Sequence, residues 1–258
     1  PHAQAAALLA TRVTRAAPRA CVCLFASMES LKWLWVLLAA RVAAEAPKLT
    51  YFNVAGRAEL ARLYAAVGNL TIVDSTDTSG YKTKTPSGYV PVIAHAGLFP
   101  SCAFEYGCLQ ESLAIERYVR DIAPGFLALS PQQRAVDDMF AQIKEDILQG
   151  VEDRGAIRPP AAINATFAQY LRVLELFVPE SGFVHGRTFP TGADLAVLVA
   201  LRAGFPFAQA LEAAHFDVAT RYPKVDALAA RTAAAPTVAA YLSKSKTFYA
   251  RHSSGSVL

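Results

Sequence analysis

The spacing of hydrophobic and polar residues divides the chain into two parts, and the first part alternates strands with helices. Alternating polar and apolar positions that are rich in β-branched and aromatic side chains predict strands, whereas apolar positions three and four apart predict helices. The predicted strands cover residues 48–53, 71–74 and 90–95, and the predicted helices cover residues 56–68 and 111–124. A polar stretch over residues 75–87 predicts a loop. This order is typical of an α/β domain, which we expect over residues 47–123.

The second part of the chain contains helical patterns rich in Ala and Leu, with no convincing strand from Gln132 to Lys246. Predicted helices cover residues 135–151, 165–177, 225–233 and 240–243, and a further helix begins at Thr191. Thr191 and Asp194 have the spacing of a capping box, in which both side chains accept hydrogen bonds from backbone N–H groups. The apolar run LAVLVAL that follows predicts a helix buried on most sides. We therefore expect an all-helical domain over residues 130–246.

Composition and charge indicate a globular body without a nucleic-acid surface. Hydrophobic residues make up 53% of the 258 residues and charged residues 18%, which allows a packed core. The formal net charge of +4 arises within residues 1–44, because basic and acidic residues are equal in number from Glu45 onward. Nucleic-acid binding requires clustered Lys and Arg side chains that contact phosphates. We therefore predict no nucleic-acid partner.

Residues 1–44 form a leader with the features of a targeting segment. Lys32 precedes an apolar run from Trp33 to Ala40, and small residues end the segment at Ala44. We interpret residues 28–44 as a signal peptide cleaved after Ala44, with a short N-terminal helix as the alternative. The apolar run is too short to span a membrane, so no membrane span is predicted. Residues 1–27 contain no acidic residue, and we leave open whether they are translated upstream sequence or a transit-like extension.

Glycosylation motifs and cysteine pairing favour a secretory or extracellular location. Asn69 and Asn164 each begin an Asn-x-Thr sequon at a predicted surface connection, although sequons also arise by chance and Asn164 has the alternative role of a helix cap. Without the leader, the body keeps Cys102 and Cys108, which are near enough in sequence for a local disulfide in an oxidising compartment. The alternative is a cytoplasmic protein with reduced cysteines and unmodified asparagines.

Five sequence blocks resemble the glutathione S-transferases, most closely the sigma class. In the first block, KLTYFNVAGRAELARL, Tyr51 and Phe52 end the first strand, and a Gly-Arg-Ala-Glu sequence opens the first helix. The other blocks are KTKTPSGYVPV, ESLAIERYV, TGADLAVL and YPKVDALAARTAAAPTVAAYL. The resemblance covers Lys48 to about Lys246. It implies a thioredoxin-like glutathione-binding domain, a following all-helical domain, and a homodimer.

The resemblance implies that Tyr51 activates the thiol of glutathione, which serves as co-substrate without a metal. A hydroxyl at a strand end can donate a hydrogen bond to the sulfur anion, while Arg57 and the helix start add positive field. Val90 would bind the cysteinyl amide through its backbone, beside a cis-proline. The implied glutathione-binding residues are Phe52, Arg57, Lys82, Tyr89, Val90, Pro91, Glu111 and Ser112. Glu111 and Ser112 would hold the γ-glutamyl end, and Lys82 the glycyl carboxylate.

Some of these residues also have ordinary structural roles, and the chain departs from the family at several positions. The alternative role for Tyr51 is that of an ordinary aromatic residue in a strand. The alternative for Ser112 is a helix N-cap, and the alternative for Lys82 is a solvated side chain in a loop. Thr78 replaces an aromatic residue, and Lys144, followed by Glu145, replaces an acidic one; both changes place glutathione affinity in question. An extra segment of about nine residues, which holds the two body cysteines, precedes the last predicted helix of the first domain.

Two functions remain open from the sequence. The first is a glutathione transferase that attacks small hydrophobic electrophiles in detoxification, or that uses glutathione for isomerisation or peroxide reduction. The second is a catalytically weak binding or structural protein with the same fold in the secretory pathway. Other chemistries are not expected, because the histidines are isolated, no G-x-S-x-G elbow occurs, and Cys102 and Cys108 do not form a C-x-x-C pair.

Overall fold

The computed structural model describes residues 45–99 and 107–248 of the chain. The chain divides into residues 1–41 and a compact second unit, residues 42–258. The predicted leader and signal peptide lie outside the described residues, so their interpretation stays a prediction. The architecture that follows is that of the second unit.

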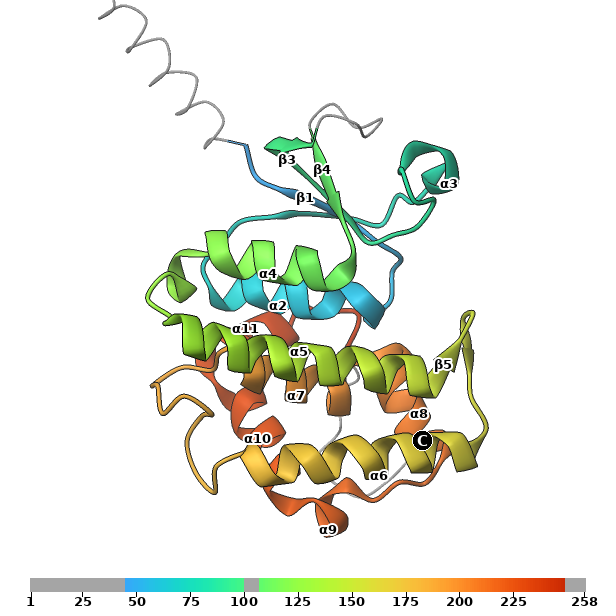
Figure 1. Ribbon diagram of the computed structural model, residues 1–258, viewed down its shortest axis with the longest axis vertical. Helices are drawn as coiled ribbons and strands as arrows, with labels where there is room; N and C mark the ends of the chain where they lie inside the picture. Colours follow the sequence, from blue (N-terminus) through green and yellow to red (C-terminus); the bar gives the residue numbers. More distant parts are fainter. Residues whose placement is uncertain (1–44, 100–106, 249–258) are drawn as a thin grey trace, which may run out of the picture. The chain divides into compact units, whose positions relative to one another are not determined.

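A four-stranded mixed sheet forms the α/β part (Figure 1). Its strands are β1 (Lys48–Thr50), β2 (Val73–Ser75), β3 (Val92–Phe99) and β4 (Cys108–Gln110), in the order β2-β1-β3-β4. The β1–β2 pair is parallel, whereas β3 runs antiparallel to both β1 and β4. Leu49 pairs with Ile93 and both side chains are fully buried, which fixes the register of the central strands.

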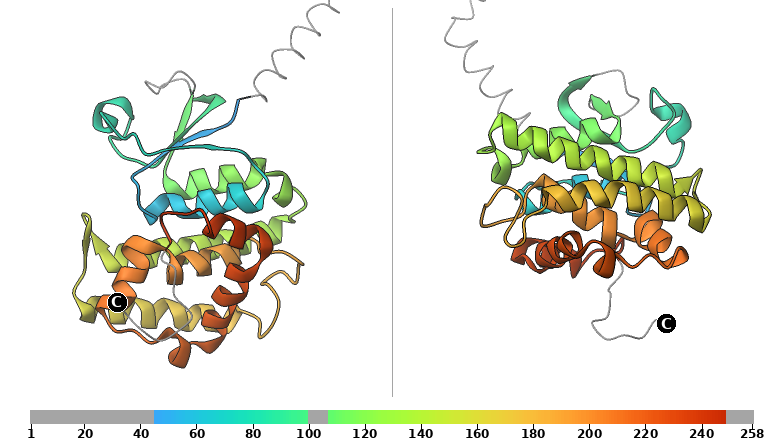
Figure 2. Two further views of the ribbon diagram at one scale, coloured as in Figure 1. Left: turned by 180° about the vertical axis from the view of Figure 1, so that it is seen from behind. Right: turned by 60° about the horizontal axis from the view of Figure 1, so that its bottom comes forward.

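Two helices cover the face of the sheet that is turned toward the helical part (Figures 1 and 2). A 3₁₀ turn (Gly56–Ala58) leads into α2 (Glu59–Val67), and α4 (Ser112–Ile122) follows β4. Each helix buries an apolar stripe at the predicted spacing; Leu60 and Leu63 lie on α2, and Ile115 and Val119 lie on α4. The sequence-based helices are therefore confirmed, with ends shifted by a few residues.

Two elements of the α/β part differ from the sequence-based prediction. The expected loop over residues 75–87 contains a one-turn helix, α3 (Tyr81–Lys84). Strand β4 lies in the segment that we read as an insertion, and three residues are too few to show alternation. Cys108 therefore belongs to the sheet, where it is disulfide-bonded. Its predicted partner, Cys102, lies outside the described residues, so that pairing stays a prediction.

The remaining part is helical, apart from one small hairpin. The helices are α5 (Pro131–Val151), α6 (Pro160–Phe177), α7 (Gly192–Arg202), α8 (Gln209–Ala213), α9 (Val218–Arg221), α10 (Pro223–Ala234) and α11 (Pro236–Leu242), with a 3₁₀ turn at Pro124–Phe126 and a π turn at Gly204–Ala208. The expectation of no strand here is wrong at the α5–α6 connection, where β5 (Glu152–Asp153) pairs with β6 (Ala156–Ile157). None of the helices in the described ranges is long and apolar enough to cross a membrane.

Helix α7 is the centre of the helical part, since almost its whole length is buried. The predicted capping box is confirmed, because the backbone N–H of Thr191 donates to Asp194 Oδ2 at 2.8 Å. Burial raises the pKa of Asp194 to about 6 despite this hydrogen bond and one from the Val184 N–H. Gly192 is required at the helix start, because a Cβ there would meet the Tyr64 hydroxyl at 1.9 Å.

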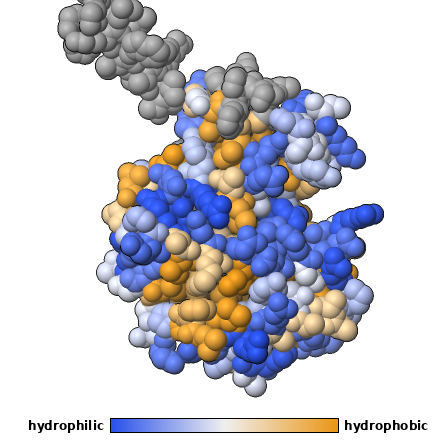
Figure 3. Space-filling view, in the orientation of Figure 1, coloured by the Kyte–Doolittle hydropathy of each residue, from blue (hydrophilic) through white to orange (hydrophobic). Residues whose placement is uncertain are grey.

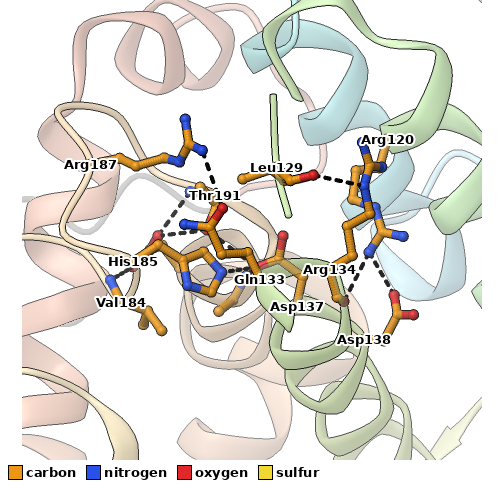
Figure 4. A network of polar contacts seen from close by, with 12 residues as sticks. Arg120, Leu129, Gln133, Arg134, Asp137, Asp138, Val184, His185, Arg187 and Thr191 are labelled. Atoms are coloured by element: carbon orange, nitrogen blue, oxygen red, sulfur yellow. Dashed lines mark hydrogen bonds and ion pairs between the residues drawn. The ribbon is translucent and has the colours of Figure 1, made fainter. Parts of the chain in front are cut away.

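Asp137 joins α5 to the start of α7 through a buried network (Figure 4). Its Oδ1 accepts a hydrogen bond from the Ala193 N–H at 2.8 Å and one from the Thr191 hydroxyl at 3.2 Å. The His185 ring, which points toward the carboxylate in Figure 4, places Nε2 2.9 Å from the same oxygen. These contacts fix the rotation of α5 about its axis, and with it the side chains that α5 presents to the site described below.

Candidate active site

A cavity of about 590 Å³ lies between the α/β part and helix α5. This volume is in the usual range for a small-molecule site. One wall comes from the loop before β3 and from the β4–α4 junction, and the other wall comes from α5. The predicted site residues that line the cavity are Arg57, Tyr89, Val90, Pro91, Glu111 and Ser112. The structure thus brings together residues that are up to 55 positions apart in the sequence, from Arg57 to Ser112.

Tyr51 directly follows β1 and points its hydroxyl toward the start of the first helix. The backbone N–H of Arg57 lies 3.3 Å from the Tyr51 oxygen and donates to it. Gly56 permits this approach, because a Cβ there would lie 2.5 Å from the same oxygen. Burial raises the pKa of Tyr51 above its usual value, although the Arg57 N–H and the Arg57 charge act in the opposite direction. The hydroxyl is therefore protonated at neutral pH and keeps its proton for donation to a ligand.

Arg57 connects the 3₁₀ turn at Gly56–Ala58 to the opposite wall of the cavity. Its Nε donates to Glu145 Oε1 on α5 at 2.7 Å. The Arg57 side chain is about one third exposed, whereas that of Glu145 is largely buried. This ion pair places a positive charge beside Tyr51 and fixes the separation between the two walls.

The β4–α4 junction presents a helix start to the cavity. Glu111 precedes the first helical residue and has φ 69° and ψ 116°, a backbone conformation that a side-chain-bearing residue rarely adopts. Such strained residues cluster at ligand sites. Ser112 is the first residue of α4 and is not its N-cap, so the N-cap alternative for Ser112 is wrong. Ser112 and Leu113 at this helix start line the cavity, and the free backbone N–H groups of a helix start favour a carboxylate.

The backbone before β3 has the predicted conformation. The Val90–Pro91 peptide bond is cis, and both residues line the cavity. Pro91 immediately precedes β3, so it occupies the strand start at which a missing N–H removes no ladder hydrogen bond. Gln110 closes this side of the cavity, since its Nε2 donates to the Tyr89 carbonyl at 3.1 Å.

The predicted catalytic residue Tyr51 does not line the cavity, and neither do the predicted glutathione-binding residues Phe52 and Lys82. Lys82 is exposed on the short helix α3. Phe52 is 40% exposed and packs edge-on against Tyr81 at a centroid distance of 5.7 Å. No residue of α3 lines the cavity, and the roles given to Lys82 and Phe52 stay predictions.

Lys144 points into the protein core, away from the cavity. Its Nζ lies 2.6 Å from Glu116 Oε1 on α4 and 3.7 Å from Glu145 Oε2, and its side chain is 1% exposed. Burial raises the pKa of Glu116 to about 7, although the charge of Lys144 acts against the rise. The departure from the family at Lys144 is thus matched by a carboxylate on the neighbouring helix.

Sequence reasoning missed the α5 wall of the cavity. Its lining residues are Gln142, Glu145 and Gln149, of which only Glu145 was noticed, as the neighbour of Lys144. The available signal was their spacing of three and four, which places them on one face of a helix. A polar row beside a buried apolar row is ordinary for a surface helix, so this signal by itself did not point to a site.

A buried ion pair on α2 holds the backbone of the loop between Tyr51 and Arg57. Arg62 donates to the Val54 carbonyl at 2.9 Å and to the Phe52 carbonyl at 3.4 Å. The Arg62 guanidinium also bonds to Glu59 Oε2 at 3.0 Å. The backbone of the loop is therefore held by α2 before any ligand binds.

The two sequons occupy different environments. Asn69 is exposed just after α2, with φ 57°. Asn164, in contrast, lies inside α6, so its placement in a surface connection is wrong. The Asn164 amide donates to the Pro160 carbonyl at 2.9 Å and to the Ala214 carbonyl at 3.4 Å. No cluster of His, Cys, Asp or Glu suited to a metal ion occurs among the residues that the structure describes.

Comparison with known proteins finds similarity to the glutathione S-transferases. Residues 137–245 match the family model described as "Glutathione S-transferase, C-terminal domain". The chain is 26% identical over 207 residues to hematopoietic prostaglandin D synthase of Gallus gallus, which covers 76% of this chain and 95% of that protein. The sigma-class glutathione S-transferase of Fasciola hepatica is similar in structure, with a TM-score of 0.58, 20% identity, and coverage of 78% of this chain and 96% of that chain.

A further similar structure is that of a monomeric glutathione S-transferase from the hookworm Necator americanus, with a TM-score of 0.58 and 20% identity over 77% of this chain and 97% of that one. The fold is therefore that of the glutathione S-transferases, a mixed sheet with helices followed by a helical domain. Residues 137–245 match a glutathione S-transferase C-terminal domain, as the sequence blocks in that part predict, and the chain shares its fold with glutathione S-transferases that include a sigma-class protein.

Proposed function

We propose that this protein is a glutathione transferase in which Tyr51 activates the thiol. One observation carries the proposal: a buried, protonated tyrosine hydroxyl lies at the start of the first helix, 3.3 Å from the Arg57 N–H that borders the cavity. A chicken relative that is named as a prostaglandin D synthase supports a catalytic role. The co-substrate would be glutathione, and the second substrate an electrophile, for which the resemblance implies apolar character.

The chemistry requires a stabilised thiolate. A free thiol has a pKa of about 8.5, so only a small fraction is ionised at neutral pH. The Tyr51 hydroxyl already accepts from the Arg57 N–H, and its own proton is left to donate to the sulfur anion. The positive charge of Arg57 and the helix start stabilise the same anion. The sulfur then bonds to an electrophilic carbon, and the displaced electron pair leaves with the leaving group or moves onto a neighbouring carbonyl oxygen.

The other end of the cavity suits the peptide part of glutathione. The cis-proline junction offers the backbone of Val90 to an amide, and the start of α4 at Ser112 offers N–H groups to a carboxylate. Glu111 adds an anion for the α-ammonium group. The glycyl carboxylate would lie toward α3, where Lys82 is exposed.

The proposal is tested by titrating the thiol of bound glutathione. We expect the thiol pKa, followed by ultraviolet absorbance of the thiolate, to fall by at least about one unit when glutathione binds, because an anion gains a preorganised donor. The alternative, a protein that binds glutathione without turnover, predicts retention on immobilised glutathione with an unchanged thiol pKa and no accelerated thioether formation. No binding at all would contradict both functions.

We also propose that the chain enters the secretory pathway, as its leader and sequons suggest. In that case native-source protein should carry a disulfide at Cys108 and a glycan at Asn69. Asn164 should stay unmodified, because its amide is engaged between α6 and Ala214. Intact mass spectra, recorded before and after deglycosylation and thiol alkylation, measure both the number of glycans and the number of free thiols. Two free body thiols and no glycan would contradict this location without affecting the fold.

A homodimer is proposed from the resemblance alone. Two-fold homodimers are the commonest oligomers, yet one similar structure is described as monomeric. On the face seen in Figure 3 the orange, hydrophobic surface gathers over the helical half, whereas the protruding β5–β6 hairpin is hydrophilic. The molar mass measured by light scattering at micromolar concentration distinguishes a monomer from a dimer.

A further inference from the structure

The wall that α5 contributes to the cavity is polar throughout. Its lining side chains, Gln142, Glu145 and Gln149, follow one another along one face of the helix. The apolar side chains of α5, among them Ile147 and Leu148, are buried and directed away from solvent. Under the proposed function, glutathione occupies the wall formed by the β3 and α4 junctions. The α5 wall is then the surface that a second substrate contacts.

This wall lies beside the expected position of the sulfur. Tyr51 and the Arg57 N–H mark that position, and the Arg57 side chain reaches Glu145 at 2.7 Å. Gln142 lies about one turn before Glu145 on α5, and Gln149 lies about one turn after it. An electrophile attacked by the sulfur must therefore contact amide and carboxylate groups.

The α5 wall offers both donors and acceptors of hydrogen bonds. Gln142 Nε2 uses one of its two N–H groups on Asp146 Oδ1 at 2.8 Å, which leaves the other N–H to donate and the Gln142 carbonyl oxygen to accept. Glu145 is already paired, since its Oε1 accepts from Arg57 Nε at 2.7 Å and its buried Oε2 lies 3.7 Å from Lys144 Nζ. Gln149 can both accept and donate. An apolar substrate would displace water from these groups without replacing its hydrogen bonds, which disfavours its binding.

We propose that the second substrate is a polar electrophile that carries a hydrogen-bonding group such as a hydroxyl, in place of the apolar one that the resemblance implies. This inference rests on the proposed function. In the simplest reaction the thiolate sulfur bonds to the β-carbon of an unsaturated ketone. The π electrons move to the carbonyl oxygen, and the proton released by the thiol ends on the α-carbon. The donor-bearing tail bonds to Gln142 and Gln149 during the attack.

The experiment compares two unsaturated ketones of equal length, one ending in a hydroxyl and the other in a methyl group. We expect kcat/KM at saturating glutathione, corrected for the uncatalysed reaction, to favour the hydroxyl-bearing ketone by about three- to tenfold, the effect of one net hydrogen bond. The double variant Gln142→Leu/Gln149→Leu should abolish or reverse this preference and leave the KM for glutathione unchanged. Gln132→Leu is the matched control, because Gln132 is exposed on the same helix outside the cavity and should leave the preference intact.

Calorimetric affinities of the two preformed glutathione conjugates provide a readout that does not depend on turnover. Tighter binding of the hydroxyl-bearing conjugate, lost in the double variant, supports the polar wall even in a chain that turns over neither ketone. Equal or better turnover and binding with the methyl-ended compounds would overturn the inference while leaving the proposed function in place. Failure to bind glutathione or either conjugate would overturn both.

Discussion

Replacement of Tyr51 by phenylalanine is expected to lower kcat/KM for thioether formation at neutral pH by about one to three orders of magnitude, the effect of losing one preorganised donor to an anion. The change removes one oxygen and little volume, and the ring stays packed beside Phe52 and under the Arg62 guanidinium. The thiol pKa in the complex should rise, so that part of the lost rate returns as the pH increases. Stopped-flow rates across the pH range measure both effects.

Tyr170→Phe is the matched control for this substitution. Tyr170 lies on α6 in the helical part, whereas Tyr51 lies beside the first helix and accepts the Arg57 N–H. Its loss of a hydroxyl should leave both the rate and the pH profile as in the unmodified protein. A Tyr51→Phe protein with unchanged turnover and an unchanged thiol pKa would remove Tyr51 from the catalytic role.

Substitution of Lys144 by methionine is expected to destabilise the fold by about 3–5 kcal/mol, the cost of leaving one member of a buried ion pair without its partner. Lys144 and Glu116 join α5 to α4, and their side chains are 1% and 2% exposed. Because Glu116 Oε2 already has no hydrogen-bond partner within the described part of the chain, loss of the ammonium leaves a nearly bare carboxylate. Chemical denaturation followed by circular dichroism measures the free energy of unfolding.

The loss of folding stability in the Lys144→Met variant should depend on pH in a defined direction. Burial raises the pKa of Glu116 from its ordinary 4.5 to about 7. A raised pKa in the folded state favours folding at low pH, and this contribution is lost as the pH rises through 7. Without Lys144 the pKa rises further. The Lys144→Met variant should therefore be least stable above pH 7 and should recover part of its stability near pH 5, where Glu116 is protonated.

The double variant Glu116→Met/Lys144→Met separates the pairing from the volume of the side chains. Apolar replacement of both members of a buried pair is often neutral or stabilising, so most of the loss should be regained and its pH dependence should disappear. A single Lys144→Met variant as stable as the unmodified protein at pH 8 would show that this pair contributes nothing to the junction of the two parts.

The sequence by itself determined those features that depend on local chemistry. The strand-helix order, the capping box at Thr191 and Asp194, and the position of Tyr51 near the end of the first strand all follow from residues a few positions apart. Short-range hydrogen bonds and helical periodicity decide such features, and no distant part of the chain is needed to recognise them. The family blocks then supplied the order of the elements and most of the residues on one wall of the site.

Tertiary structure alone decided the partners of the charged side chains and the second wall of the site. Nothing near Lys144 in the sequence indicates that Glu116 neutralises it, and nothing near Arg57 indicates a contact with Glu145, 88 positions away. Strand β4 is too short to show an alternating sequence pattern. It forms because β3 provides backbone hydrogen-bonding partners along its edge. In each case the deciding interaction joins segments that only folding brings together, since the energy of a buried charge or an unpaired strand depends on its neighbours in space.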